Sequence, residues 1–583
     1  MSMRSLNRYA IIPVVLTVLA VLPMLQFRPV SASQSNRLKD TFPPDTNGVI
    51  HESMDFQSLG KTAEASEREM IECISEAKRT EIEDKIREYE AGLDKSLHSS
   101  AVGPEPYPFF PHAGTVWQDL YLRNFVDLDP SPGILDWACT GLTYNGHTGV
   151  DSGLRSFREQ DIGVPVFAAL DGTVVEVNDG AFDRNTSCQP NAPVNYVILH
   201  HGNGHTSWYL HLRKGSVAVR LSQFVKAGTQ LGLTGSSGCS TGPHLHFESR
   251  YANVTYEPFS GRCRPGPSYW VNQLSIQREM YARDISFSAT PFTGLADFPF
   301  DQGVRVNTFL PGFQRIFFKT EIDNVAPFSP YTIAIRRPNG TDAGHISGTI
   351  GSSFIPVAWL WWYFDLNLDA IGTWLVTLVI GPFYVEAYFN VVASSGQIVN
   401  HRPLSITTGF DPARPNATDV IFCRVNTFLP YKDPDYDIVS YRYRWSVNGV
   451  LVRDVTTSAL SDAIPKGTAG AGDRVACTVE PYDGKAFGPS STSSVAIPGV
   501  AVPSISSVDF DGKKKLSISG QLFGSSPTVL INSVNITDYL RSSSDTFLKL
   551  KGKTAALGLR SGNNSIQVVN ASGAGSNVYI LRL

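Results

Sequence analysis

The stretch "STGPHLHFE", residues 240–248, combines a glycine turn with a short strand that carries two histidines. Side chains at positions i and i+2 of a strand project from the same face, so His244 and His246 are expected side by side, with Glu248 next along. Pro243 stands at the start of this strand, where its missing N–H does least harm. Histidine pairs are common on strand surfaces, so a metal site is indicated only where other ligands accompany them.

Further metal-ligating side chains lie in the same region of the chain. The segment "YNGHTGVDSG", residues 144–153, supplies His147 and Asp151, and "HTSWYLHL", residues 205–212, supplies His211. Zinc hydrolases offer three protein ligands from His, Asp, Glu or Cys and leave a fourth position for water. The helical HExxH arrangement is absent, so the candidates belong to strands and turns.

Short strands and glycine turns alternate from about residue 115 to residue 265. The segment "GVPVFAALDGTVVEVNDG", residues 163–180, holds two strand-like runs around a turn at Asp171 and Gly172. The segment "NYVILHHGNGHTSWYLHL", residues 195–212, has a Gly-Asn-Gly turn between β-rich halves, which predicts a hairpin. The region is therefore expected to be a compact, mostly antiparallel β domain.

These motifs resemble the catalytic domain of the lysostaphin-type zinc metallopeptidases, which are cell-wall endopeptidases with a narrow groove on an antiparallel sheet. The resemblance consists of "GHTGVD", "GVPVFAALDGTVV", "YLHL" and "VKAGTQLGLTGSSGCSTGPHLHFE", in that order. It implies that His147, Asp151 and His246 hold one zinc ion (Zn2+) per chain. It also implies that His211 and His244 are catalytic histidines that do not bind the metal.

The implied chemistry is hydrolysis of peptide bonds in peptidoglycan. Two imidazoles and one carboxylate leave zinc Lewis-acidic, with an open position where water loses a proton near neutral pH. We assign the base role to His244, which takes that proton and passes it to the leaving amine. We assign stabilisation of the oxyanion to His211. The sequence leaves these two roles exchangeable.

Other polar side chains of the region have a structural interpretation beside a functional one. Tyr209 either shares the face of His211 or packs in the core. Glu248 either orients a ligand histidine or forms a salt bridge on the sheet. Three histidines that flank the hairpin turn are interpreted as structural, namely His200, His201 and His205.

The N-terminus predicts export. Together with the resemblance, it implies a bacterial protein of the periplasm, the cell envelope or the exterior. Arg4 and Arg8 precede an apolar run at residues 9–25, and small residues follow at 31–33. This pattern predicts that residues 1–33 are a signal peptide. An uncleaved anchor is the alternative, because the run approaches the ~20 residues that span a bilayer.

The rest of the chain predicts a mainly β, multidomain protein. Residues 34–104 are expected to be a flexible lead followed by an amphipathic helix within residues 62–97, whose apolar face has steps of three and four (Ile82, Ile86, Tyr89, Leu93 and Leu97). This helix would pack on its neighbour or on a second copy. The peptidase domain is assigned to residues 105–272. About three β-sandwich modules follow, at residues 273–400, 401–499 (immunoglobulin-like) and 500–583 (a small immunoglobulin-like module).

The seven cysteines suggest disulfides, which export makes possible. Cys423 and Cys477 are expected to form a cross-sheet disulfide over Trp445, as in immunoglobulin-like sandwiches. Cys263 is a candidate partner of Cys239, although Cys139 and Cys188 offer alternatives. The odd count leaves a free thiol, for which we choose Cys73, in the polar helix. No CxxC pair occurs, so a structural zinc ribbon is not expected.

The formal net charge of -4 provides no basic field, which argues against nucleic acid as a partner. The expected partners are peptidoglycan peptides, with the β modules positioning the enzyme on wall or surface polymer. Two other functions fit the same residues. One is an extracellular protease of glycine-rich proteins, and the other is a non-catalytic protein that binds the cell wall or activates other wall enzymes.

Overall fold

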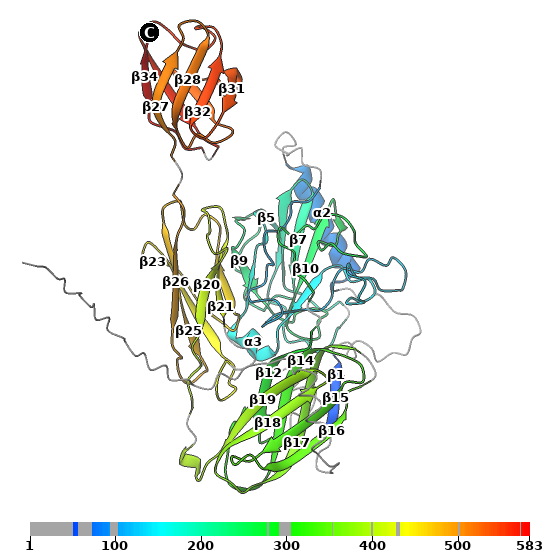
Figure 1. Ribbon diagram of the computed structural model, residues 1–583. Helices are drawn as coiled ribbons and strands as arrows, with labels where there is room; N and C mark the ends of the chain where they lie inside the picture. The colour runs from blue at the N-terminus through cyan, green and yellow to red at the C-terminus, as the bar shows by residue number, and fades with distance from the viewer. Residues whose placement is uncertain are drawn as a thin grey trace, which may run out of the picture. The chain divides into compact units, whose positions relative to one another are not determined.

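The computed structural model describes residues 50–55, 73–93, 103–189, 191–276, 279–290, 305–351, 354–397, 400–426, 432–499, 502–571 and 573–583 (Figure 1). The predicted signal peptide lies outside these residues. Among the helices that are described, none is both long and apolar enough to cross a membrane. Strands dominate and nearly all pair antiparallel, which confirms the mainly β, multidomain fold class.

The candidate site belongs to an eight-stranded antiparallel sheet. Its strands follow the order β2 (Tyr121–Leu122), β3 (Val150–Gly153), β10 (His244–Tyr251), β7 (His205–Leu210), β6 (Tyr196–Gly202), β5 (Gly172–Asn178) and β8 (Phe224–Val225), and β11 (Val254–Thr255) pairs with β10. The predicted hairpin at residues 195–212 is β6 and β7. Beside this sheet lie the pair β4 (Pro165–Phe167) and β9 (Gln230–Leu233) and the short helix α3 (Phe157–Ile162).

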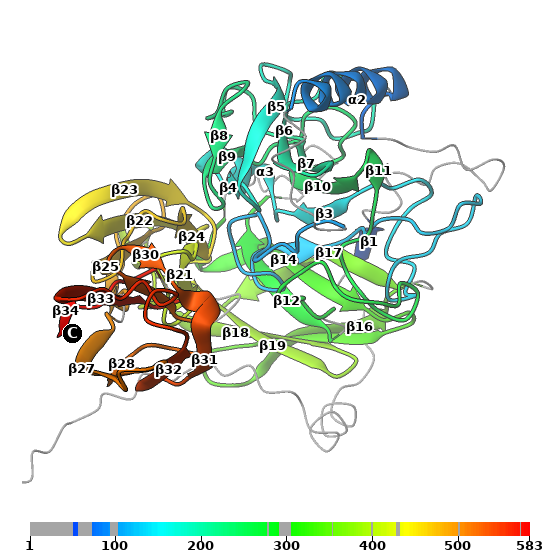
Figure 2. The same cartoon turned by 90° about the horizontal axis from the view of Figure 1, so that it is seen from above.

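The two faces of this sheet pack against different partners because side chains alternate along each strand. Val197, Leu199 and Tyr209 belong to the main core of the domain. Residues of the opposite register form a second cluster with helix α2 (Glu76–Ala91), namely Tyr196, Ile198, Trp208 and Leu210. Both views place α2 against the sheet, beside β5 and β7 (Figures 1 and 2).

Helix α2 is shorter than the predicted helix at residues 62–97 within the described part of the chain. It begins after Ser75, whose side chain accepts a hydrogen bond from the backbone N–H of Lys78, and it ends before Gly92. Ile82 and Ile86 are fully buried, as the spacing predicts. Cys73 lies before the helix and is buried, so its placement in a polar helix was wrong.

The disulfides join Cys139 to Cys263 and Cys188 to Cys239. The suggested pairing of Cys239 with Cys263 was therefore wrong, because the turn before β10 lies next to the loop that holds Cys188. Cys73, Cys423 and Cys477 are free and buried, which confirms Cys73 as an unpaired thiol.

Residues 279–397, together with β1 (Ile50–Asp55), form a separate compact unit of two sheets. One sheet has the order β1, β17 (Ile355–Leu368), β14 (Gly312–Val325) and β12 (Tyr281–Ser288). The other has the order β13 (Thr308–Phe309), β19 (Phe383–Val391), β18 (Gly372–Ile380), β15 (Pro330–Arg336) and β16 (Asp342–Thr349), followed by a short 3-10 turn, η3 (Ser395–Gln397). The aromatic run at 354–364 forms most of β17. Strand β1 lies in the lead that was expected to be flexible, so that expectation was wrong for residues 50–55.

Residues 400–499 form two further sheets. The strands are β20 (Thr407–Asp411), β21 (Ile421–Asn426) and β24 (Ser461–Ile464) in one, and β23 (Val450–Thr457), β22 (Ser440–Val447), β25 (Arg474–Tyr482) and β26 (Ser491–Ala496) in the other. Cys423 and Cys477 lie in different sheets and share a core with Trp445, as expected. They remain thiols, so the predicted disulfide between them is not formed in this structure.

Residues 502–583 contain two four-stranded sheets around their own core. The first has the order β27 (Ser504–Phe510), β28 (Lys515–Gln521), β32 (Phe547–Lys551) and β31 (Leu540–Ser543). The second has the order β30 (Val534–Asn535), β29 (Thr528–Ile531), β33 (Asn563–Val569) and β34 (Tyr579–Arg582), and the 3-10 turn η4 (Thr537–Tyr539) precedes β31.

Candidate metal centre

Three predicted ligands meet at the point where β3 pairs with β10. The register sets His246 opposite Asp151, and the turn before β3 carries His147. Nδ1 of His246 lies 3.0 Å from Oδ1 of Asp151 and 3.1 Å from Nε2 of His147. Nε2 of His147 lies 3.2 Å from the same carboxylate oxygen. The three atoms that could bind a metal ion therefore form a nearly equilateral triangle.

The spacing and chemistry of these atoms fit a zinc ion. A tetrahedral ion with donors at about 2.0–2.1 Å separates neighbouring donor atoms by about 3.3 Å. Nδ1 of His147 lies 2.8 Å from the carbonyl oxygen of Phe125, which only accepts hydrogen bonds. Nδ1 therefore carries a proton, and Nε2 is the nitrogen that would bind an ion at the triangle after releasing its own proton.

Two residues that sequence reasoning missed support this triangle. Nδ2 of Asn124 donates a hydrogen bond to Oδ2 of Asp151 (2.9 Å) and so fixes the carboxylate with Oδ1 toward the histidines. A Cβ atom at Gly149 would lie 2.6 Å from Cε1 and Nε2 of His246, so only glycine leaves room for that ring. Gly149 stands inside the quoted "GHTGVD" motif, whereas nothing in the sequence distinguishes Asn124.

The other two histidines are fixed by backbone carbonyl groups. Nδ1 of His211 donates to the carbonyl oxygen of Ser237 (2.6 Å), and Nδ1 of His244 donates to that of Gly242 (2.8 Å). Nε2 of His211 is buried and has no hydrogen-bond partner, and Nε2 of His244 lies 3.8 Å from Oδ1 of Asp151. The two ring centroids are 4.5 Å apart, so all five predicted site residues converge. His211 has a φ of 65°, an uncommon backbone conformation for a residue with a side chain.

Burial and neighbouring charges distinguish the protonation states of these groups. Burial opposes protonation of His147, but the charge of Asp151 prevails and raises the pKa of His147 to about 9. Burial and the proximity of His211 lower the pKa of His244 to about 4. His244 is therefore a neutral imidazole at neutral pH, with an unprotonated Nε2.

Glu248 lies in a network of charged groups. It accepts hydrogen bonds from Nη1 of Arg79 (2.8 Å) and Nη1 of Arg250 (2.6 Å). Although burial opposes its ionisation, the charge of Arg79 holds the pKa of Glu248 well below its usual value. Its Oε2 lies 3.7 Å from Nε2 of His246, which is beyond hydrogen-bond length. The contacts favour the salt-bridge interpretation of Glu248.

The remaining residues that the sequence singled out are engaged elsewhere. Tyr209 accepts a hydrogen bond from the backbone N–H of Ala169 (2.8 Å) and belongs to the main core. Nε2 of His200 pairs with Glu90 of α2 (3.1 Å). His201 and His205 bond to the carbonyl oxygen of Asp171 and to the hydroxyl of Tyr107, respectively.

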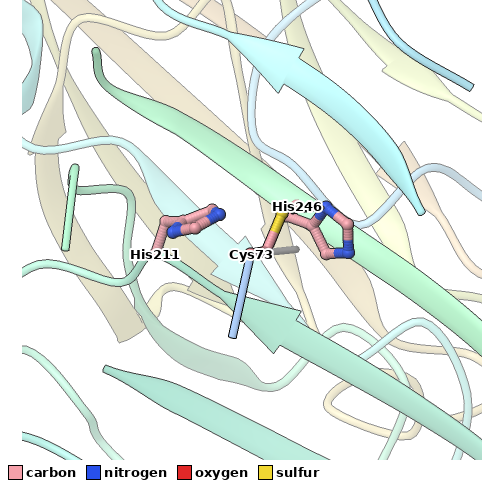
Figure 3. A group of neighbouring side chains, drawn as sticks. All are labelled: Cys73, His211 and His246. Atoms are coloured by element: carbon pink, nitrogen blue, oxygen red, sulfur yellow. Dashed lines mark hydrogen bonds between the residues drawn. The ribbon is translucent and has the colours of Figure 1, made fainter. Parts of the chain in front are cut away.

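Cys73 enters this site from the segment before α2. Its Sγ lies 3.3 Å from Nδ1 of His246 and 3.6 Å from the hydroxyl of Tyr144. Figure 3 shows the thiol between the rings of His211 and His246, directed at the latter. The sequence identifies Cys73 only as an unpaired thiol, because no local pattern links it to a histidine 173 residues away.

Comparison with known proteins identifies the domain. Residues 145–258 match the family model described as Peptidase family M23. An uncharacterized metalloprotease of Haemophilus influenzae is 35% identical over 135 residues, which are 23% of this chain and 24% of that protein. The peptidoglycan DD-endopeptidase ShyA of Vibrio cholerae is 39% identical over 87 residues, which are 15% of this chain and 17% of that protein.

Lysostaphin of Staphylococcus simulans is 36% identical over 109 residues, which are 18% of this chain and 19% of that protein. The solved catalytic domain of lysostaphin aligns with 29% identity and a TM-score of 0.16, covering 22% of this chain and 86% of that one. The chain therefore spans a quarter or less of the length of these three curated relatives. The family match and these relatives show that this chain carries, within residues 145–258, a metallopeptidase domain of family M23.

Proposed function

We propose that this protein is an exported bacterial zinc endopeptidase that hydrolyses peptide bonds in peptidoglycan. The observation that carries the proposal is the convergence of Nε2 of His147, Oδ1 of Asp151 and Nδ1 of His246 within 3.2 Å of one another. The metalloprotease relative and the relative named as a peptidoglycan DD-endopeptidase support the reaction and the substrate.

In this proposal His147, Asp151 and His246 hold the ion. When bound, zinc supplies a Lewis acid that polarises the scissile carbonyl and makes a water molecule acidic enough to react near neutral pH. His244 acts as the base, because its Nε2 is unprotonated at neutral pH and lies 3.8 Å from Asp151. The same nitrogen then passes the proton to the leaving amine.

His211 is proposed to stabilise the negative oxygen of the tetrahedral intermediate. Its Nδ1 donates to the carbonyl oxygen of Ser237, so Nε2 is the ring nitrogen left to face substrate. The base role is kept for His244, whose Nε2 is unprotonated at neutral pH, and the oxyanion role for His211.

Export is supported by the two disulfides of the peptidase region. The bonds Cys139–Cys263 and Cys188–Cys239 are typical of proteins that fold in an oxidising compartment. We further propose that residues 105–272 are the catalytic unit and that the β modules at 273–400, 401–499 and 500–583 position it on wall or surface polymer.

Digestion of purified sacculi tests the proposal. The mature protein is expected to clear a suspension of sacculi, to lose this activity with a chelator and to recover it with zinc. Mass spectrometry of the released fragments identifies the bond that is cut. A glycine-rich protein digested in parallel distinguishes a general extracellular protease, and a wall-binding protein without activity clears nothing in either condition.

A further inference from the structure

The loop before β22 gathers three carboxylates of the module at residues 400–499. One carboxylate oxygen each of Asp433, Asp435 and Asp437 lies within 4.8 Å of the other two. Two oxygens on opposite sides of a calcium ion are about 4.6–5.2 Å apart, because each calcium–oxygen distance is about 2.3–2.6 Å. A single ion can therefore reach all three carboxylates. This cluster is separate from the candidate metal centre of the peptidase region.

Hydrogen bonds to the backbone hold this loop around Asp433. Its Oδ1 accepts hydrogen bonds from the N–H groups of Asp435 (2.8 Å) and Asp437 (3.4 Å). In an extended strand, residues two positions apart are separated by about 6.4–6.8 Å along the chain. The two hydrogen bonds bend the chain instead, so the three carboxylates come within reach of one ion.

Asp433 has one oxygen atom that the protein leaves unsatisfied. The residue is 1% exposed, and its Oδ2 is buried without a hydrogen-bond partner among the described residues. Burial of a charged carboxylate is costly unless a counter-charge or hydrogen bonds compensate for it. A cation at the cluster would provide this compensation. The buried, unsatisfied oxygen distinguishes this loop from a solvated acidic surface.

Further oxygen atoms lie beside the cluster. The backbone N–H of His401 donates a hydrogen bond to Oδ2 of Asp435 (2.5 Å), and Nδ2 of Asn400 donates one to Oδ2 of Asp483 (2.7 Å). Asp483 is buried, and Oδ1 of Asn400 is a buried atom that lacks a hydrogen-bond partner within the described part of the chain. Calcium takes 6–8 oxygen ligands from carboxylates, amides, carbonyl groups and water. The surroundings of the cluster therefore provide more oxygens of the kind that calcium binds.

Two exposed basic side chains bind the outer members of the cluster. Nζ of Lys485 lies 3.0 Å from Oδ2 of Asp437, and Nδ1 of His401 lies 3.0 Å from Oδ1 of Asp435. The side chain of Lys485 is 61% exposed and that of His401 is 55% exposed. Exposed ion pairs are weak, because water solvates both charges. A divalent ion can therefore displace the ammonium group of Lys485 from Asp437.

We propose that Asp433, Asp435 and Asp437 bind a calcium ion and that this ion stabilises the module at residues 400–499. All of the candidate ligand atoms are oxygens, which favours a hard cation such as calcium over zinc. Asn400 and His401 are bonded to carboxylates at the cluster, so the ion also fastens the place where the chain enters the module. The inference does not depend on the proposed function, because it concerns other residues and another metal.

Terbium(III) luminescence tests the site in the zinc-loaded full chain. Terbium has nearly the ionic radius of calcium and emits when a nearby tyrosine is excited, and Tyr436 stands between two of the proposed ligands in the sequence. We expect this emission in the wild type. We expect calcium to displace terbium with a calcium dissociation constant of about 10⁻⁴–10⁻³ M, as in extracellular modules.

Two variants and a control locate the ion. Asp433→Asn keeps an oxygen at Oδ1 for the loop but removes the charge, so it should lower the calcium affinity at least about tenfold. Lys485→Gln removes the competing ammonium group and should raise the affinity about twofold to fivefold. Asp454→Asn is the matched control, because it removes a carboxylate of the same module that pairs with Arg442. Calcium should raise the unfolding temperature of the wild type and the control more than that of Asp433→Asn.

Several results would overturn the calcium site. These are equal calcium affinities in the wild type and Asp433→Asn, and terbium emission that calcium does not displace. If Asp433→Asn does not fold, the comparison with Lys485→Gln decides, and an affinity in Lys485→Gln that does not exceed that of the wild type would overturn the site. A chain that binds calcium but no zinc would contradict the proposed function and leave this inference intact.

Discussion

Oδ1 of Asp151 lies 3.0 Å from Nδ1 of His246, across the pairing of β3 with β10. The two residues are 95 positions apart in the chain and are brought together by strand register alone. A slip of one residue in either strand would turn one of these side chains to the opposite face of the sheet. The candidate centre therefore depends on the same pairing that builds the sheet.

His244→Ala should separate catalysis from metal binding. Its Nε2 lies 3.8 Å from Asp151, outside the triangle of ligands, so the variant should retain one zinc per chain. Loss of a general base typically lowers the rate about 10²–10⁴-fold. Metal content and the rate of sacculus digestion measure the two effects. Normal hydrolysis by this variant would refute the assigned role.

Asn124→Ala should weaken metal binding without removing a ligand. The variant frees the carboxylate of Asp151 from the hydrogen bond that orients it, and loss of such a partner typically costs about 10–100-fold in metal affinity. Competition with a chromogenic chelator measures the zinc dissociation constant. Asn178→Ala is the matched control, because the side chain of Asn178 donates a hydrogen bond to the carbonyl oxygen of Val194 in the same domain. Equal dissociation constants for both variants would contradict this role of Asn124.

Gly149→Ala should displace the ring of His246. The added Cβ would lie 2.6 Å from two ring atoms, a distance at which something must move. We expect a lower zinc affinity and slower digestion, with the fold retained as judged by circular dichroism. Gly409→Ala serves as a control, because an added Cβ meets nothing within 4 Å there. An unchanged zinc affinity in Gly149→Ala would contradict the expectation that this glycine is needed to position the ring of His246.

Stability should fall as pH decreases below the ordinary pKa of histidine. Burial is the main cause that lowers the pKa of His112 to about 3, of His201 to about 4 and of His205 to about 2. These groups gain a proton on unfolding at pH values between their folded pKa and about 6.5, so the unfolded state binds more protons there. The stability that these three histidines contribute is therefore full above about pH 6.5, and it is lost by about 1.4 kcal/mol per pH unit for each of them below that pH.

Denaturant unfolding of the metal-free protein at several pH values measures this slope. His112→Gln should reduce the slope by about one proton, whatever its effect on stability at neutral pH. A free energy of unfolding that is the same at about pH 7 and about pH 5 would contradict the buried, neutral state of these histidines.

The sequence predicts the site better than its surroundings, for physical reasons. The alternation of His244, Leu245 and His246 identifies one face of a strand, and the hairpin pattern places His211 at the end of its neighbour. These signals are local. The motifs of the family resemblance, which follow one another in a fixed order along the chain, identify the five site residues. Asn124 and Cys73 belong to segments without such a pattern, and only tertiary packing brings them to the site.

The wrong predictions of the Cys239 disulfide and of the flexible lead also concern features that only tertiary packing determines. The pairing of Cys239 with Cys188, instead of Cys263, depends on which loops lie next to each other, and spacing along the chain contains no such information. Strand β1 depends on a partner strand about 300 residues later, so a polar lead segment gives no local indication of it. The burial of Ile82 and Ile86 was predictable because a helical period fixes one face, although not the surface that the face covers.

The zinc content of the purified mature protein, compared with that of Asp151→Ala, tests the central claim most directly. The account predicts one zinc per wild-type chain after extensive dialysis and none in the variant, with both proteins folded by circular dichroism. A wild-type chain without stoichiometric metal, or an Asp151→Ala chain that holds zinc as tightly as the wild type, would contradict it.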